Sequence, residues 1–233
     1  IGADIMMPLD ICISAKSTKK QHIDAVEKTS IWAEQSKKAK RKKDSLLFGI
    51  IQGGRSNQLR EMSAKSLIEV GFDGYSIGGV STGERKTDMY KTIRSSTQLI
   101  PDKFPRYLMG IGSPEDLVSA VSEGVDMFDC VIPTRNGRNG HIFTEDGVIN
   151  IKNGKYKNDY SPLDEKSDSP FGAQFSKAYV RHLFNVNEIL GVRISSPLNI
   201  AFYMKLMKTI RSKIEAGKFG KWSKSFLKKW GDE

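Results

Sequence analysis

Residues 126–140 read DMFDCVIPTRNGRNG, and this stretch decides how the chain is interpreted. Apolar Met127 and Phe128 indicate the end of a buried strand, and Asp129 follows them directly. Beyond it we expect a loop rich in glycine and asparagine that carries Arg135 and Arg138. Guanidinium groups form bidentate hydrogen bonds with phosphate oxygens, and a carboxylate can act as nucleophile or base. Taken alone, the stretch fits better with an aspartate that caps a turn beside solvated arginines.

Four earlier segments repeat this pattern of a short apolar run followed by polar residues or glycines. They are ADIMMPLD at 3–10, LLFGIIQGG at 46–54, FDGYSIGGVSTGE at 72–84 and PRYLMGIGSPED at 105–116. Helical periodicity follows them at 19–38, 57–70, 84–99 and 114–123. Alternating strands and helices predict parallel βα units, in which binding groups collect at the carboxyl ends of the strands. The residues expected around this one mouth are Asp10, Gln52, Gly79, Met109 and Asp129.

Composition excludes several classes of protein. The chain has 233 residues and a mean hydropathy of −0.42, and no apolar run in it is long enough to cross a bilayer. A signal-peptide pattern is missing from its first residues. Cys12 and Cys130 are its only cysteines, which gives no disulfide framework and predicts a reducing, cytoplasmic location. Because the first residue is Ile1 rather than Met, we expect the chain to begin partway through a longer protein.

The net charge of +10 is concentrated in clusters of lysine. One cluster is KKAKRKK at 37–43, and another is GKFGKWSKSFLKK at 217–229. Such segments suit a nucleic-acid backbone, although solvated helix faces explain 37–43 equally well. Trp222, Phe226 and Trp230 recur at helical spacing, which predicts a packing face rather than a platform for stacked bases.

These motifs together resemble the queuine tRNA-ribosyltransferases, also called tRNA-guanine transglycosylases, and the bacterial type in particular. FGIIQGG, FDGYSIGGVSTGE, RYLMGIGSPEDL and DMFDCVIPTRNGRNG stand in the order and spacing of that family's signature blocks. The resemblance runs from about residue 1 to about residue 230. It implies an α/β fold of the (β/α)₈ TIM-barrel type with a small zinc-binding subdomain, and exchange of the wobble guanine of GUN-anticodon tRNAs for a 7-deazaguanine.

The resemblance also implies a role for each site residue. Asp129 would be the nucleophile that attacks the ribose C1′ and holds the tRNA covalently, while Arg135 and Arg138 would bind anticodon phosphates. The predicted base-binding residues are Asp10, Gln52, Gly79, Val80, Glu84 and Met109. Asp10, Gln52 and the Gly79 N–H would hydrogen-bond the edge of the base. The backbone at Val80 and Ser81, supported by Glu84, would meet the aminomethyl substituent, and Met109 would form an apolar wall.

This sequence departs from the family at its metal site. The family carries three cysteines and a histidine that hold structural zinc. The matching positions here are Ser167, Ser169, Gly172 and Leu198, none of which is a good zinc ligand. We therefore predict that the chain has no zinc cofactor, and that apolar residues such as Phe171, Phe175 and Leu198 offset part of the lost stability.

The chain also departs in length, because a closed barrel needs eight strand–helix units and only the last five are expected here. We predict a partial barrel with the base pocket in residues 1–140. Residues 141–233 are expected to form a small β insert and a helical subdomain with a degenerate zinc site. At the selectivity loop, Thr82 is isosteric with the valine of bacterial members, which favours 7-aminomethyl-7-deazaguanine over queuine. Family members commonly form homodimers, an expectation that extends to this chain.

Three functions remain open from the sequence. The first is a tRNA base-exchange enzyme, or the C-terminal part of one, with tRNA and a 7-deazaguanine base as partners and no membrane. The second is a non-catalytic tRNA-binding or partner subunit of the same fold, which the missing strands and zinc ligands favour. An unrelated phosphate-binding barrel enzyme is the third, and it has the least support.

Overall fold

The structure, a computed structural model, describes residues 2–41 and 44–230. They form two compact units. The first contains the described residues up to Gly112 together with Asp116–Asp129, and the second contains Ser113–Glu115 and the described residues from Cys130 onward. The domain boundary predicted after residue 140 stays a prediction.

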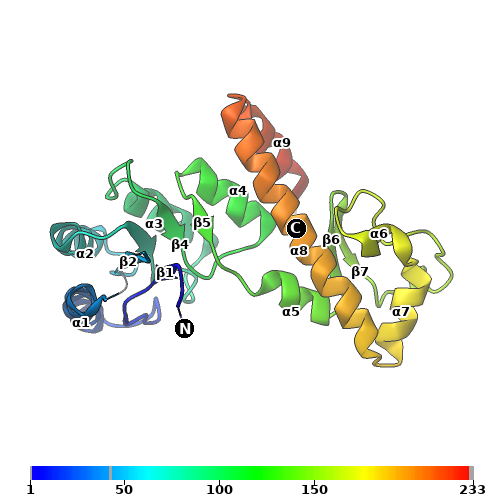
Figure 1. Cartoon of the computed structure of the whole chain (residues 1–233), viewed down its shortest axis with the longest axis horizontal. Coiled ribbons are helices and arrows are strands. Elements are labelled where there is room, and N and C mark those ends of the chain that lie inside the picture. The colour runs from blue at the N-terminus through cyan, green and yellow to red at the C-terminus, as the bar shows by residue number, and fades with distance from the viewer. Residues whose placement is uncertain (1, 42–43, 231–233) are drawn as a thin grey trace. The chain divides into compact units, whose positions relative to one another are not determined.

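The first unit is built on a sheet of five parallel strands in the order β1-β2-β3-β4-β5, which is also their order along the chain (Figure 1). The strands are β1 Ile5–Met6, β2 Leu46–Ile51, β3 Gly74–Ile77, β4 Arg106–Leu108 and β5 Met127–Phe128. Neighbours pair in register, with Ile51 opposite Ile77 and Ile77 opposite Leu108. The sheet is curled, which fits part of a (β/α)₈ barrel and confirms the predicted α/β class.

Helices follow the first four strands, as the periodicity predicts. They are α1 Lys19–Ala39, α2 Asn57–Val70, α3 Lys86–Thr97 and α4 Pro114–Ser122. The Ser56 hydroxyl caps α2 by accepting a hydrogen bond from the Leu59 N–H at 3.4 Å. At the other end, Gly71 adopts a positive φ of 78°, which side chains disfavour, and its N–H donates to the Leu67 carbonyl.

The core of this unit lies between the sheet and its helices. Ile51, Ile77 and Leu108 are fully buried, because strands covered on both faces are apolar throughout. On α2 the buried face contains Leu59, Arg60, Ser63 and Leu67, whereas Met62 is 42% exposed on another face of the helix.

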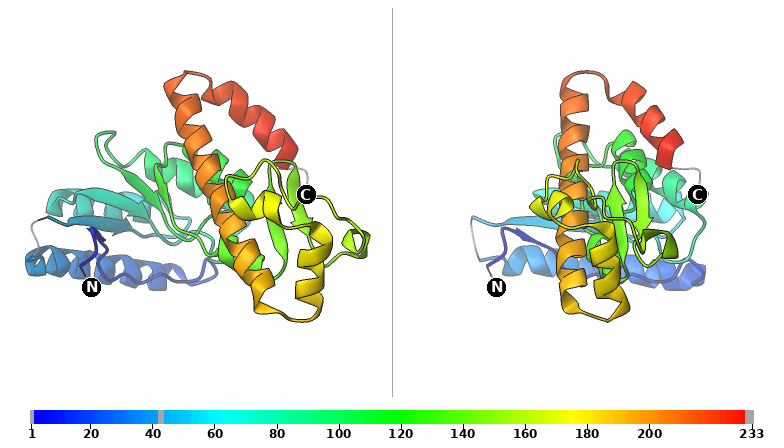
Figure 2. Two further views of the ribbon diagram at one scale, coloured as in Figure 1. Left: turned by 45° about the vertical axis from the view of Figure 1, so that its right-hand side comes forward. Right: turned by 90° about the vertical axis from the view of Figure 1, so that its right-hand side faces the viewer.

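The second unit combines a hairpin with helices (Figure 2). In chain order its elements are α5 Ile132–Arg138, β6 His141–Thr144, β7 Gly147–Asn150, a 3₁₀ turn at Gly154–Tyr156, α6 Pro170–Gln174, α7 Lys177–Asn185, α8 Ile189–Glu215 and α9 Phe219–Trp230. The strands β6 and β7 pair antiparallel. Gly217, at a φ of 65°, lies between α8 and α9 where the chain reverses (Figure 2). An apolar core that includes Ile142, Leu183 and Leu198 joins the hairpin to α7 and α8.

The predicted loop after Asp129 is wrong, because Arg135 and Arg138 lie on the short helix α5. Pro133 stands in the first turn, where its missing N–H costs nothing. Gly137 lets the helix approach α8 closely, since an added Cβ would lie 2.9 Å from the Ser196 Cα. Tertiary packing therefore overrides the low helix propensity of glycine and asparagine.

None of the described helices combines the length and the apolar composition that a membrane span requires.

Asp73 gives a test of how the first unit is held together. Its Oδ2 accepts hydrogen bonds from the Leu47 N–H at 2.8 Å and from the Lys40 ammonium at 3.3 Å, and these bonds lower the pKa of Asp73. We expect Asp73→Asn to reduce the free energy of unfolding at pH 7 by about 1 kcal/mol, a value already reduced for the partial exposure of the carboxylate.

The pKa of Asp73 is lower in the folded protein than the unfolded-state pKa near 3.8. The carboxylate therefore contributes its full stability above that pH, and the contribution is lost as the pH falls through the folded-state pKa. Urea unfolding of the wild type and of Asp73→Asn at several pH values from 7 to 3 measures this contribution. Asp24→Asn is the control, since that residue is exposed on α1. A difference between wild type and Asp73→Asn that is unchanged at pH 3 would contradict the assignment.

Candidate active site at the carboxyl edge of the sheet

Asp10, Gln52 and the paired glycines meet beyond the ends of strands β1, β2 and β3. The Gln52 Nε2 donates to the Asp10 Oδ2 at 2.7 Å, and Gln52 is only 3% exposed. An added Cβ on Gly78 would lie 2.7 Å from Nε2, and one on Gly79 would lie 2.5 Å from Oε1 of the same amide. The glycines are therefore required, because the backbone approaches the amide more closely than any side chain permits. The structure therefore brings Asp10, Gln52 and Gly79 into direct contact, as the sequence predicts.

The loop after Gly79 is shaped by Glu84. Its carboxylate accepts hydrogen bonds from the backbone N–H of Ser81 and from that of Thr82, the latter at 2.8 Å. Ser81 has a φ of 58°, an uncommon conformation for a residue with a side chain, and the Glu84 contact holds it there. Val80, at the start of this loop, is buried. Glu84 thus determines which backbone groups the loop presents.

Asp129 follows β5 and is held by two donors from the adjacent strand unit. The Tyr107 hydroxyl donates to Asp129 Oδ1 at 2.7 Å, and the Gly110 N–H donates to the same oxygen at 2.9 Å. Burial and the Asp129 carboxylate raise the pKa of Tyr107, so the phenol stays protonated and can donate at neutral pH. Met109 lies between the two donors in sequence, directly after β4, and is half-buried. Tyr107 was missed from the sequence because β4 was interpreted only as an apolar run.

Arg60 is a second residue that sequence reasoning missed. It is fully buried on α2, where its Nε donates to the Gly54 carbonyl at 2.7 Å and its Nη2 to the Gly78 carbonyl at 2.9 Å. Nη2 also lies 3.4 Å from the Gly79 carbonyl. Burial lowers the pKa of Arg60 to about 10, which still leaves it charged at neutral pH. One cation therefore ties together the glycine-rich ends of β2 and β3.

The thiols and imidazoles give little additional chemistry. Desolvation and the Asp10 carboxylate raise the pKa of Cys12, which disfavours the thiolate that a nucleophile needs. His22 packs its ring against Gly54. Among residues 2–41 and 44–230, no three His, Cys, Asp or Glu side chains are grouped as metal ligands would be.

The remaining predicted residues belong to the second unit. Arg135 and Arg138 are exposed on α5. Trp222, Phe226 and Trp230 form a continuous row, with ring centroids 5.2 Å and 5.6 Å apart, and Trp230 packs on Phe202 of α8. The prediction of a packing face is therefore confirmed. In the basic cluster at 37–43, Lys37 and Lys38 end α1, while Lys42 and Lys43 lie outside the described residues.

The four positions matched to zinc ligands also lie in the second unit. Ser169 caps α6, Ser167 precedes it in the same loop, and Gly172 is buried within the helix. Leu198 is 1% exposed in the apolar core of α8. Two hydroxyls, a glycine and a leucine do not fit a tetrahedral zinc site.

Comparison with known proteins agrees with this geometry. The family model described as "Queuine tRNA-ribosyltransferase" matches residues 1–232. Curated proteins with the name "Queuine tRNA-ribosyltransferase" from Francisella tularensis subsp. tularensis (strain WY96-3418), subsp. holarctica (strain OSU18) and subsp. novicida (strain U112) are each 48% identical over 227 residues. The match covers 97% of this chain and 62% of each relative, so the chain spans less than two thirds of their length.

Substituting Arg60 tests whether it supports the glycine loops. Arg60→Met keeps most of the side-chain volume but leaves the buried carbonyls of Gly54 and Gly78 without their donor. We expect the free energy of unfolding to fall by about 3 kcal/mol, measured by urea denaturation. Arg55→Met is the matched control, because the Arg55 side chain is 57% exposed and should change stability by less than about 0.5 kcal/mol. Equal stability of the two variants would show that Arg60 does not have this role.

Proposed function

Because the chain belongs to the queuine tRNA-ribosyltransferase family, we propose that it carries the base-exchange site of a tRNA-guanine transglycosylase. The proposed reaction replaces the wobble guanine of tRNAs with GUN anticodons by a 7-deazaguanine. The observation that carries the proposal is the Gln52 amide, which lies between the Asp10 carboxylate and the Gly78–Gly79 backbone at the carboxyl edge of the same sheet as Asp129. Such an array offers donors and acceptors to the edge of a planar base.

The polar groups have hydrogen-bonding capacity left for that base. Gln52 uses one amide proton on Asp10, and an amide has two. Asp10 accepts this bond at Oδ2, so its other oxygen can accept from the ring N–H or the amino group of guanine. We propose that Gln52 and the Gly79 N–H bind the carbonyl oxygen of the base. Reaching a base in tRNA further requires that it be turned out of its stack.

Asp129 is proposed as the nucleophile. Both of its hydrogen bonds are made by Oδ1, which orients the carboxylate and makes Oδ2 the oxygen that attacks C1′ of the ribose. As the bond from Oδ2 to C1′ forms, the glycosidic bond breaks and its electron pair leaves on the guanine, which takes up a proton. The incoming 7-deazaguanine then attacks C1′ through its own ring nitrogen, loses a proton and releases Asp129. Two displacements at one carbon retain its configuration.

The loop held by Glu84 is proposed to select the base. It would present the backbone at Val80 and Ser81 to the substituent at position 7, and Met109 would cover the ring. Thr82 has the volume of valine and favours the compact aminomethyl group over queuine.

We further propose that Arg135 and Arg138 bind anticodon phosphates and that the protein forms homodimers. We also propose that it holds no structural zinc and that it acts in the cytoplasm, where tRNA is modified.

The alternative is a non-catalytic tRNA-binding subunit of the same family. It is favoured by the residues at the family's four zinc-ligand positions, Ser167, Ser169, Gly172 and Leu198, none of which is a good zinc ligand.

An exchange assay distinguishes the two functions. Labelled guanine should be incorporated into tRNA with a GUN anticodon by the 233-residue chain, or by a chain extended at its N-terminus to the length of the relatives. Asp129→Asn should lower this rate at least 1,000-fold while tRNA binding stays within about threefold, because the nucleophile is lost and the phosphate contacts remain. Asp24→Asn, on the exposed face of α1, is the control and should leave both unchanged.

Exchange that survives in Asp129→Asn would reject Asp129 as the nucleophile. Salt-dependent tRNA binding with no exchange, even by the extended chain, would support the non-catalytic alternative. Tyr107→Phe adds a graded test: loss of one bond to Oδ1 should lower kcat about tenfold with little change in KM.

A further inference from the structure

In the second unit, hydrogen bonds and closely packed backbone occupy the positions that match the family's zinc ligands. The Ser167 hydroxyl accepts a hydrogen bond from the Ser169 N–H at 3.1 Å, and the Ser169 hydroxyl accepts from the Phe171 N–H at 3.4 Å. The Asp164 N–H donates to the Gly172 carbonyl at 3.0 Å. A Cβ added at Gly172 would lie 2.2 Å from the Asp164 carbonyl oxygen, so the backbone fills the space a cysteine would need.

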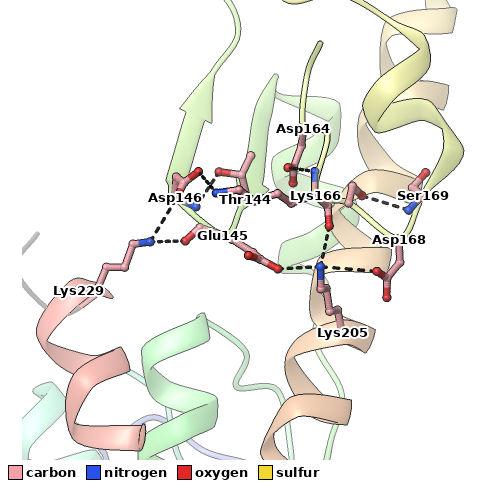
Figure 3. Close-up of polar contacts among 10 residues, drawn as sticks. Thr144, Glu145, Asp146, Asp164, Lys166, Asp168, Ser169, Lys205 and Lys229 are labelled. Carbon is pink, nitrogen blue, oxygen red and sulfur yellow. Dashed lines mark hydrogen bonds and ion pairs between the residues drawn. The ribbon is translucent and has the colours of Figure 1, made fainter.

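A cation nevertheless lies beside this loop, supplied by the chain itself (Figure 3). The Lys205 ammonium, on α8, is 2.7 Å from Glu145 Oε1 and 3.6 Å from Asp168 Oδ1. It also donates to the Lys166 carbonyl at 2.6 Å. Glu145 lies in the turn of the β6–β7 hairpin, while Lys166 and Asp168 lie in the loop that precedes α6. One side chain on α8 therefore contacts two separate segments, the hairpin turn and the loop that precedes α6.

We propose that the Lys205 ammonium, together with the buried Leu198, takes over the structural task of the family's metal in this chain. A structural zinc ion joins distant segments through four ligands. An ammonium has three N–H donors, and here three oxygen atoms from two segments surround it. The lysine side chain itself connects these two segments to a third, the helix α8. The second unit is then folded and stable without bound metal.

The surroundings of Lys205 support this role. The hydrogen bond to Glu145 raises the pKa of Lys205, so the charge persists at neutral pH. Asp146, beside Glu145 in the hairpin turn, is paired with Lys166 at 3.0 Å, and the Lys229 ammonium donates to the Glu145 carbonyl at 2.5 Å. Lys166 belongs to the loop that Lys205 contacts, whereas Lys229 reaches the turn from α9, on the side away from Lys205 (Figure 3). The Lys205 side chain is 32% exposed, so each contact is modest and the network acts through their number.

Hydrogen exchange of the full chain tests the proposal, since it reports the loop directly. In Lys205→Met, the amides of the loop and of α6 should exchange about tenfold faster than in wild type, because the bond to the Lys166 carbonyl and both ion pairs are lost. Lys208→Met is the matched control on the same helix, where the lysine is exposed, and it should leave these rates within about twofold. Equal rates in the two variants would overturn the role of Lys205.

Two further measurements keep the proposal testable if Lys205→Met folds poorly. Lys205→Arg retains the charge and the donors, so it should recover most of the protection; an arginine variant as unprotected as the methionine variant would count against a cation. Elemental analysis should find no zinc, and neither a chelator nor added zinc should move the urea midpoint. One equivalent of zinc per chain, or a midpoint that falls with chelator, would overturn the metal-free assignment.

These readouts concern folding and metal content alone. A chain that exchanges no base could still show them, so failure of this proposal and failure of the proposed function are separate results.

Discussion

A fully buried guanidinium imposes the strictest constraint on the first unit. Arg60 has no exposed surface, and an arginine cannot shed its proton at neutral pH, so its donors must find acceptors inside the protein. Nε and Nη2 find them in the carbonyls of Gly54, Gly78 and Gly79, which belong to the segments that follow two neighbouring strands, while Nη1 is buried without a hydrogen-bond partner among the described residues. Fixing these carbonyls also fixes the N–H groups beside them. The backbone at the carboxyl edge of the sheet is thus fixed by a residue that need not touch a ligand.

Other groups along the same edge of the sheet also hold backbone or carboxylate atoms in place. Glu84 holds the backbone of Ser81 and Thr82, and Tyr107 with the Gly110 N–H orients Asp129. Each supporting group bonds the backbone or a carboxylate oxygen and leaves other atoms available for a ligand. The base proposed above would meet groups that are already oriented, which reduces the entropy lost on binding and the rearrangement needed for reaction.

The sequence predicts the parts of this structure that depend on local pattern. Helices α1 to α4 begin and end within a few residues of their predicted bounds, because periodicity and caps such as Ser56 act over a single turn. Asp10, Gln52 and Gly79 are found together because parallel strands bring their carboxyl ends to one edge. Arg60 and α5 escape prediction for the opposite reason. An arginine within a helical pattern is ordinarily a solvated residue, and the helix at Ile132–Arg138 forms through packing of Gly137 on α8, which no local signal encodes.

If the second unit holds no structural zinc, as we propose, other contacts must supply its stability. Loss of a structural metal removes a large and concentrated contribution to stability, which no single hydrogen bond can replace. Here the contribution is divided. Leu198 adds apolar burial, the Ser167 and Ser169 hydroxyls satisfy backbone amides, and Lys205 joins the hairpin turn to the loop. At Gly172 the backbone occupies the space that a cysteine side chain would need, since an added Cβ would lie 2.2 Å from the Asp164 carbonyl oxygen. A metal site depends on all of its ligands at once, whereas support divided among many contacts is lost in steps, so on this proposal single substitutions in the region should each destabilise it only in part.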